Sequence, residues 1–485
     1  MKFSNQYAQL GRKYSIKTRP DRPQKPELVL WNQELAEVLG LDLSDEQIKC
    51  FFSGQKIATD STPVALAYAG HQFGHFNPQL GDGRAHLLGE LTDKYGHLQE
   101  VQLKGSGPTP FSRQGDGKCG IKPAVREYLM SEAMHAMRVP TTRSLAVVTT
   151  GEPVYRQSSS PGAVVTRVAQ SHIRVGTFEY FAAREMYTEV KVLADLTLSR
   201  HFPKIDQSDD NKYIKLISEV IDNQIHLITE WMRVGFIHGV MNTDNTLLSG
   251  HTIDYGPCAM VGIYDTDTVF SSIDRNGRYS FGNQANMAQW NMARLAECFL
   301  PLIDIDDKKA IASLLPLIEN FADKYNSSFN LMMAHKLGFK HNNKHTDELQ
   351  TNLLNLMSKH QLDYTTTFIN LQHSLNPKPN HSSHVEIKIE AVLMDWHNKW
   401  LYLLNKENIK FENARNLMSQ YNPLVIPRNH HIEKILDLVE ADTSSDWVNT
   451  FLTVIQSPYT ITKNTHLFQD PSTDGDMNYQ TFCGT

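Results

Sequence analysis

The chain has 485 residues, of which 40% are hydrophobic and 21% charged, and its formal net charge is −6. This composition is typical of a soluble globular protein with several structural units, and it disfavours binding to nucleic acid or to an anionic membrane surface. We expect a cytoplasmic protein, because there is no membrane-spanning run or signal peptide and the five scattered cysteines form no Cys-x-x-Cys pair.

The first half of the chain predicts an extension followed by a region rich in strands. Residues 1–60 are irregular before a helix expected around Leu30–Leu39. Residues 61–180 are rich in glycine and in short apolar alternations, which predict strands and tight loops. Val101 and Leu103 indicate one strand, which ends at Lys104. Apolar residues at three- and four-residue steps predict a helix over 122–138.

The second half is predicted to be mainly helical. Residues 183–235 read as helices, a group of motif loops follows, and helices dominate again from Ala285. We expect long loops between helices over 337–386, where asparagine and histidine are frequent. The chain ends in a tail that carries Cys483.

The segment from His238 to Asn245 resembles the catalytic loop of a protein kinase. Kinases carry His-Arg-Asp, four further residues and then Asn, and the two residues named here keep that separation. Asp254 opens an Asp-Tyr-Gly turn where kinases carry Asp-Phe-Gly, whose aspartate holds Mg²⁺ on the nucleotide phosphates. Val240 stands at the position of the kinase base and cannot accept a proton. The sequence therefore predicts the metal-binding parts of a kinase site without the usual base.

A kinase-like site also needs a strand lysine that contacts the phosphates and a helix glutamate that holds it. Lys104 ends a predicted strand, and Glu127 lies in the next predicted helix. The alternative is that both side chains are simply solvated. The ordered presence of His238, Asn245 and Asp254 downstream favours the functional interpretation.

Two glycine clusters flank Lys104, and two arginines follow. Glycines let backbone N–H groups approach phosphates, and an adjacent arginine adds a fixed positive charge. The alternatives are ordinary turns and, for the two later arginines, exposed positions on an edge strand. The candidate residues are Gly81, Gly83, Arg84, Asp116 and Gly117, followed by Arg167 and Arg174.

His71 and His75 are four residues apart, which is a spacing found in helical zinc sites. We expect a structural role for them, because the glutamate of such motifs is absent and Gly74 weakens a helix.

Several long motifs together resemble the selenoprotein O (SelO/YdiU) family, and the resemblance covers most of the chain outside 337–386. The motifs are Tyr68-Ala69-Gly70-His71-Gln72-Phe73-Gly74, Gln79-Leu80-Gly81-Asp82-Gly83-Arg84-Ala85, Gln102-Leu103-Lys104-Gly105-Ser106-Gly107, Arg126-Glu127-Tyr128, Pro140-Thr141-Thr142-Arg143, the segment His238–Asn245, Ile253-Asp254-Tyr255-Gly256-Pro257, Gly277-Arg278-Tyr279, Trp290-Asn291, Asn422-Pro423 and Arg428-Asn429.

The resemblance implies an α+β, protein-kinase-like two-lobed fold. It implies an N-terminal extension over 1–60, an N-lobe with nucleotide-binding loops over 61–180, a C-lobe over 181–330 and further helices over 331–485. Members of the family bind ATP in a flipped orientation and transfer AMP to Ser, Thr or Tyr hydroxyls of proteins. Transfer of UMP from UTP with Mn²⁺ is also attributed to the family.

The resemblance also implies a role for each candidate residue. ATP contacts are implied for Gly81, Gly83, Arg84, Lys104, Asp116, Gly117, Arg167, Arg174 and Asp254. Glu127 orients Lys104, Asn245 and Asp254 hold Mg²⁺ or Mn²⁺, and Asp244 is the base. The expected partners are ATP and protein substrates with hydroxyl side chains.

The chain departs from the family pattern after the metal turn and at its end. Cys258-Ala259-Met260-Val261-Gly262 replaces an aromatic-Gly-Phe-Leu-Asp run, and Ser271-Ser272-Ile273 replaces Cys-Asn-His. We expect the tail thiol of Cys483 to respond to oxidation, with Cys258 as a conceivable partner.

Two other functions are compatible with these motifs. One is a kinase-like phosphotransferase, against which Val240 argues. The other is an inactive nucleotide-binding scaffold, against which the joint retention of Lys104, Glu127, Asn245 and Asp254 argues.

Overall fold

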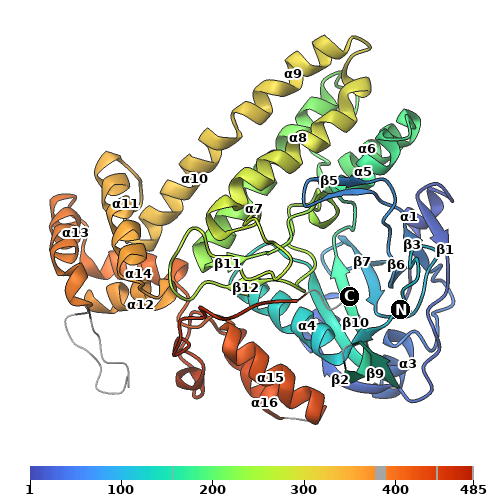
Figure 1. The fold of residues 1–485 in the computed structure, drawn as a ribbon. Coiled ribbons are helices and arrows are strands. Elements are labelled where there is room, and N and C mark those ends of the chain that lie inside the picture. The colour runs from blue at the N-terminus through green and yellow to red at the C-terminus, as the bar shows by residue number, and fades with distance from the viewer. Residues whose placement is uncertain (157, 377–388, 444–445, 483–485) are drawn as a thin grey trace.

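A computed structural model describes residues 1–156, 158–376, 389–443 and 446–482. The chain mixes α and β structure, as expected, with one large sheet on one side and helices over the rest (Figure 1). Among the described residues, no helix is both long and apolar enough to cross a membrane.

The main sheet has eight antiparallel strands in the described part of the chain. Their order is β1–β3–β6–β7–β10–β9–β2, and β8 pairs with β10. The strand predicted around Val101 and Leu103 is confirmed as β7, with Lys104 as its last residue. The strands are β1 (Ser15–Lys17), β2 (Glu27–Trp31), β3 (Val64–Leu66), β6 (Ala85–Thr92), β7 (Leu98–Lys104), β8 (Cys119–Gly120), β9 (Arg143–Tyr155) and β10 (Ser159–Ala169).

Both faces of this sheet are buried. Successive side chains of a strand point to opposite faces, so Val164 and Val165 of β10 enter two different apolar clusters. One cluster includes Leu129 of α4 (Ile121–Ala136), which packs on β9 and β10. The other includes Phe52 of α3 (Asp45–Phe52). The helix predicted over 122–138 is therefore confirmed as α4, and it lies between the sheet and the C-terminal helices.

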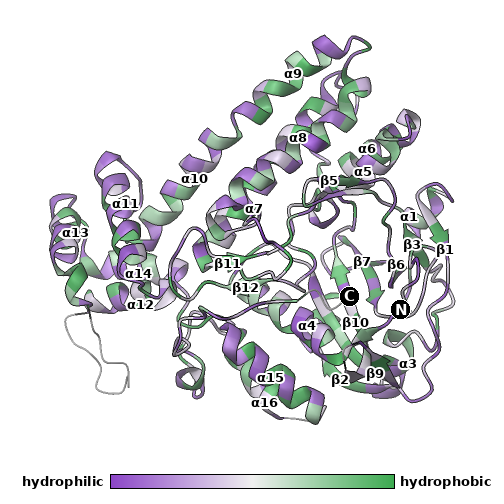
Figure 2. Cartoon of the chain, viewed as in Figure 1, coloured by the Kyte–Doolittle hydropathy of each residue, from purple (hydrophilic) through white to green (hydrophobic). Residues whose placement is uncertain are grey.

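The helical region is built around α7 (Lys212–Val234), which packs against α8 (Gln284–Ile303) and α10 (Phe321–Lys336). Gly235 ends α7 in the left-handed conformation, with φ 77°. Figure 2 shows polar and apolar residues alternating along α9 and α10, as expected for helices with one exposed face. The other helices are α1 (Gln6–Gln9), α5 (Val175–Ala182), α6 (Tyr187–His201), α9 (Asp307–Glu319), α13 (Met394–Lys406), α14 (Phe411–Tyr421), α15 (Asn429–Ala441) and α16 (Asp446–Ile455).

Two short hairpins hold the motif loops. β4 (Gly70–Gln72) pairs with β5 (His75–Asn77), and β11 (Phe236–Ile237) pairs with β12 (Ala259–Met260). The loop that begins at His238 follows β11 directly, and the Asp254 turn precedes β12. Pairing of β11 with β12 therefore brings these two motifs together.

The helix expected around Leu30–Leu39 is confirmed as α2 (Gln33–Val38), although Leu30 and Trp31 belong to strand β2, which pairs with β9 at the edge of the sheet. The Asn32 side chain starts α2 by accepting a hydrogen bond from the Leu35 N–H at 3.0 Å.

The prediction for the polar segment 337–386 is wrong. Instead of long loops it holds α11 (Lys344–Lys359) and α12 (Tyr364–Ser374), while residues 377–388 lie outside the described chain. The buried residues Leu349, Leu353 and Met357 form a narrow stripe on α11, which polar composition conceals.

Candidate functional site

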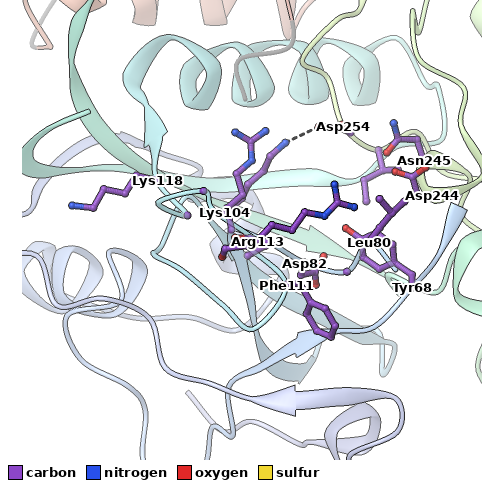
Figure 3. Close-up of a pocket in the computed structure, with 18 of the residues that line it drawn as sticks. Tyr68, Leu80, Asp82, Lys104, Phe111, Arg113, Lys118, Asp244, Asn245 and Asp254 are labelled. Carbon is purple, nitrogen blue, oxygen red and sulfur yellow. Dashed lines mark hydrogen bonds and ion pairs between the residues drawn. The ribbon is translucent and has the colours of Figure 1, made fainter. Parts of the chain in front are cut away.

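A cavity of about 410 Å³ lies at the end of β7, between the sheet and the motif loops (Figure 3). It brings together residues that are distant in the sequence. Seven lysines and arginines line it against four aspartates, so its walls suit a polyanion. The predicted residues in its lining are Gly81, Gly83, Arg84, Lys104, Asp116, Gly117, Arg167, Arg174, Asp244, Asn245 and Asp254.

Glu127 lies behind this lining and holds two of its cations. The Lys104 ammonium donates to Glu127 Oε2 at 2.6 Å, and Arg167 Nε donates to Glu127 Oε1 at 2.8 Å. Burial favours the neutral carboxyl, but Arg167 and Lys104 outweigh it and hold the pKa of Glu127 below its usual range. The predicted contact between Lys104 and Glu127 is therefore present, and Glu127 stays ionised.

Lys104 also reaches the Asp-Tyr-Gly turn. Its Nζ lies 2.7 Å from Asp254 Oδ1, a contact that Figure 3 marks with a dashed line. Burial opposes ionisation of this carboxyl, but Lys104 and Arg167 hold the pKa of Asp254 far below its usual range. Asp254 has φ 65°, which is uncommon for a residue with a side chain and is typical of strained functional turns.

His238, from the loop that follows β11, anchors the Asp254 turn. His238 is buried, and its Nε2 lies 2.8 Å from the Ile253 carbonyl oxygen. The His238 ring also stacks on Trp231 at the end of α7, with ring centroids 5.3 Å apart. His238 therefore connects the two motifs structurally and does not line the cavity.

Asp244 occupies a confined position beside β4. Its Oδ1 is buried without a hydrogen-bond partner in the described structure, and Gln72 Nε2 lies 3.4 Å from Oδ2. Burial raises the pKa of Asp244 to about 7, against the attraction of Arg174. A Cβ on Gly70 would lie 2.7 Å from Asp244 Oδ1, so only glycine leaves room for this side chain.

The backbone around Asp244 is fixed by a buried carboxylate. Thr243 Oγ1 donates to Glu179 Oε2 at 2.5 Å and accepts from the His71 N–H at 2.7 Å. His71 Nδ1 lies 2.6 Å from Glu179 Oε1.

Within the described residues, no group of three or more His, Cys, Asp or Glu is arranged to hold a metal ion.

Asn245 and Asp254 provide two oxygen ligands that fit a divalent cation. Asn245 Nδ2 donates to the Val240 carbonyl at 3.1 Å, which leaves the amide oxygen as the atom that could ligate. Mg²⁺ is commonly held by one or two protein oxygens together with substrate phosphates and water. These two residues therefore suit a metal that arrives with a nucleotide.

The glycine clusters form tight loops in the lining of the cavity. Gly81 has φ 84°, and a Cβ there would lie 2.4 Å from the Phe111 ring. Gly117 has φ 69°, and a Cβ there would lie 2.2 Å from Gly107. Both loops thus require glycine and bring backbone close to the cavity. Arg156 holds Asp116 in the cavity lining, because its Nη1 donates to Asp116 Oδ2 at 2.9 Å.

The two later arginines are not exposed residues on an edge strand. Arg167 lies on β10 inside the sheet and is 3% exposed, and Arg174, which caps α5, is 4% exposed. The Arg174 guanidinium lies 4.2 Å from the Tyr68 ring centre and 3.5 Å from Asp82 Oδ1. Burying a cation needs partners of this kind, so both arginines have fixed positions.

Several lining residues were not predicted. Asp82 lies between the two glycines of its cluster, and the Gly-Asp-Gly pattern was the only sequence signal for it. Tyr68 and Gln72 belong to the Tyr68–Gly74 motif, and the others are placed by the fold without a local motif. The unpredicted residues include Tyr68, Gln72, Asp82, Phe111, Arg113, Lys118 and Arg156.

The two cysteines named for oxidation differ in their settings. Cys258 is fully buried, its thiol donates to the Tyr255 carbonyl at 3.1 Å, and burial raises its pKa to about 12. Cys483 lies outside the described residues.

Residues 1–456 match the protein family described as "Protein adenylyltransferase SelO". The protein nucleotidyltransferase YdiU of Teredinibacter turnerae is 50% identical over 490 residues, which covers 100% of each chain. Proteins of the same name from Pseudoalteromonas translucida and Nitrosococcus oceani are 48% and 45% identical, covering 100% of this chain and 100% and 97% of theirs.

Proposed function

Because the chain belongs to the SelO family of protein adenylyltransferases, it is a nucleotidyltransferase, and we propose that it transfers AMP from ATP to protein hydroxyls. The acceptors are Ser, Thr or Tyr side chains, and pyrophosphate is released. The cavity supports this proposal because its cationic walls suit a triphosphate.

The proposed fold is that of a two-lobed protein kinase, with the N-lobe over 61–180 and the C-lobe over 181–330. The chain order of Lys104, Glu127, the His238 loop and the Asp254 turn supports it, as does the Lys104–Glu127 contact. Residues 1–60 and 331–485 are then additions to this arrangement.

The observation that carries the reaction type is Val240. This residue stands at the position of the kinase base, yet the surrounding cations and Asp254 are arranged as a phosphate site. The hydroxyl oxygen attacks the α-phosphorus, the bond from that phosphorus to the bridging oxygen of the β-phosphate breaks, and pyrophosphate leaves. Lys104, Arg167 and Arg174 stabilise the charge on the leaving group, because their positions are fixed before the reaction.

Asp244 is the proposed base that accepts the hydroxyl proton. Its unpartnered Oδ1 supports this role, since a carboxylate oxygen without an internal donor is free to receive a proton. Asn245 and Asp254 would hold Mg²⁺ or Mn²⁺. When bound, such a cation neutralises phosphate charge and favours departure of pyrophosphate.

The decisive experiment compares ATP labelled at the α-phosphorus with ATP labelled at the γ-phosphorus. With the purified chain as its own acceptor, we expect label from α-labelled ATP to remain on protein and label from γ-labelled ATP to leave as pyrophosphate. UTP labelled at the α-phosphorus is run in parallel to measure UMP transfer. Protein labelled by γ-labelled ATP would indicate a phosphotransferase. Tight ATP binding without any transfer would indicate a scaffold.

Gly70→Ala is expected to reduce turnover by about tenfold or more, because misplacement of a reacting group by about 1 Å is costly. The added methyl group would displace the Asp244 carboxylate, while the KM for ATP should change little. Gly120→Ala is the matched control, since its Cβ would meet Ser160 Oγ at an ordinary 3.5 Å. Equal turnover in both variants would contradict the position assigned to Asp244.

A further inference from the structure

Arg278 and Trp290 form a cationic surface beside the reactive loop. The Arg278 guanidinium lies 4.8 Å from the Trp290 ring centre and 5.8 Å from that of Tyr279. It also lies beside the turn of the β4–β5 hairpin, where a Cβ on Gly74 would be 3.6 Å from the Arg278 Cζ. The motifs Gly277-Arg278-Tyr279 and Trp290-Asn291 thus converge outside the nucleotide cavity.

Arg278 is a half-buried cation that forms no ion pair among the described residues. Its Nε has no hydrogen-bond partner there, and its side chain shares a hydrogen bond with the uncharged Tyr279 hydroxyl. The nearby Asp274 carboxylate accepts instead from the backbone N–H groups of Arg278 and Tyr279, at 2.9 and 2.7 Å. Arg294 lies over the same indole ring at 5.1 Å but is paired with Glu297 at 2.6 Å. Arg278 is therefore the cation of this surface that an external anion can bind.

The hairpin connects this surface to the reacting position. Gly70 at the start of β4 touches Asp244, and the Phe73 N–H donates to Asn242 Oδ1 at 3.0 Å. Phe73 then turns the chain with φ 51°, a strained value for an aromatic residue. Gly70–Gln72 is extended, and Phe73 and Gly74 form the turn, so Arg278 lies roughly 10–13 Å from Asp244 along the hairpin.

We propose that Arg278, held against Trp290, binds an acidic side chain of the acceptor protein. Consider an acceptor segment that runs along the β4–β5 hairpin with its reacting hydroxyl at Asp244. The residue of this segment that reaches Arg278 would then lie about three to five positions from the residue that carries the hydroxyl. A stacked guanidinium is pre-oriented to take a carboxylate through two parallel hydrogen bonds. The inference rests on the proposed function and specifies which hydroxyls the site accepts.

The test uses synthetic peptides with one serine and a variable residue three to five positions away, on either side. The variable residue is Asp, Ala or Lys, and labelled AMP on the peptide is measured with the full chain. We expect wild-type kcat/KM to be about tenfold higher for the best Asp peptide than for its Lys counterpart. Arg278→Ala should abolish this preference, Arg278→Glu should reverse it, and the KM for ATP should not change.

Arg294→Ala is the matched control. It removes a second cation from the Trp290 ring, but this cation is already paired with Glu297. It should keep the preference for Asp peptides. Equal use of Asp and Lys peptides by the wild type, or an unchanged preference in Arg278→Ala, overturns the inference. Self-labelling of the chain without labelling of any peptide also overturns it and leaves AMP transfer standing. Absence of any transfer removes the proposed function and the inference with it.

Discussion

Replacing Asp254 with asparagine is expected to reduce AMP transfer by at least about a hundredfold, the usual effect of removing one electrostatic group from an active site. The carboxylate lies at the cavity edge with Lys104 2.7 Å away, and its pKa is held far below the usual range. It is therefore the permanently ionised oxygen ligand of the proposed metal site. Asparagine keeps the size of the side chain and tolerates φ 65°, so the turn should survive.

The measurement is initial velocity across a titration of Mg²⁺ and, separately, of Mn²⁺. Asp254→Asn should lose its response to both ions, while binding of ATP without metal should persist through the cationic wall. Asp267→Asn, an exposed residue later in the same segment, is the matched control. A variant at Asp254 with normal velocity and normal metal dependence would remove Asp254 from the metal site.

The parts of the site that were predictable are those encoded within a few consecutive residues. The loop from His238 to Asn245, the turn at Asp254 and the strand end at Lys104 each have a fixed local spacing that limits where their side chains lie. Glu127 was predictable because a helix that follows a strand can pack against the sheet in only a few orientations. Tertiary packing then brings these locally ordered segments together in the cavity lining.

The unpredicted parts depend on contacts between distant segments. Arg156 enters the cavity wall through Asp116, and Glu179 fixes Thr243 from a helix that carries no motif. The segment around Leu30 has an apolar pattern that suits either a helix or a strand, and pairing with β9 decides in favour of β2. Local sequence contains no information about that partner, so pattern alone could not give the answer.

Replacing Lys104 and replacing Glu127 are expected to damage the protein in different ways. Glu127 neutralises both Lys104 and Arg167, so Glu127→Gln leaves two buried cations that share Asp254. We expect it to lower the free energy of unfolding by about 3–5 kcal/mol, the usual cost of removing one partner of a buried ion pair. Lys104→Met leaves Glu127 paired with Arg167, so its loss of stability should be smaller.

The order should reverse for catalysis at a temperature where both variants are folded. Lys104→Met removes a cation from the cavity and should lower kcat by about a hundredfold or more, whereas Glu127→Gln keeps the lysine and loses only its orientation. Chemical denaturation and single-turnover AMP transfer measure the two effects separately, with Lys191→Met, a surface lysine paired with Asp195, as the control. If Lys104→Met transferred AMP at the wild-type rate, the lysine would be structural only. If Glu127→Gln were the less destabilised variant, Arg167 would have to find its counter-charge elsewhere, and Glu127 would not be the residue that holds both cations.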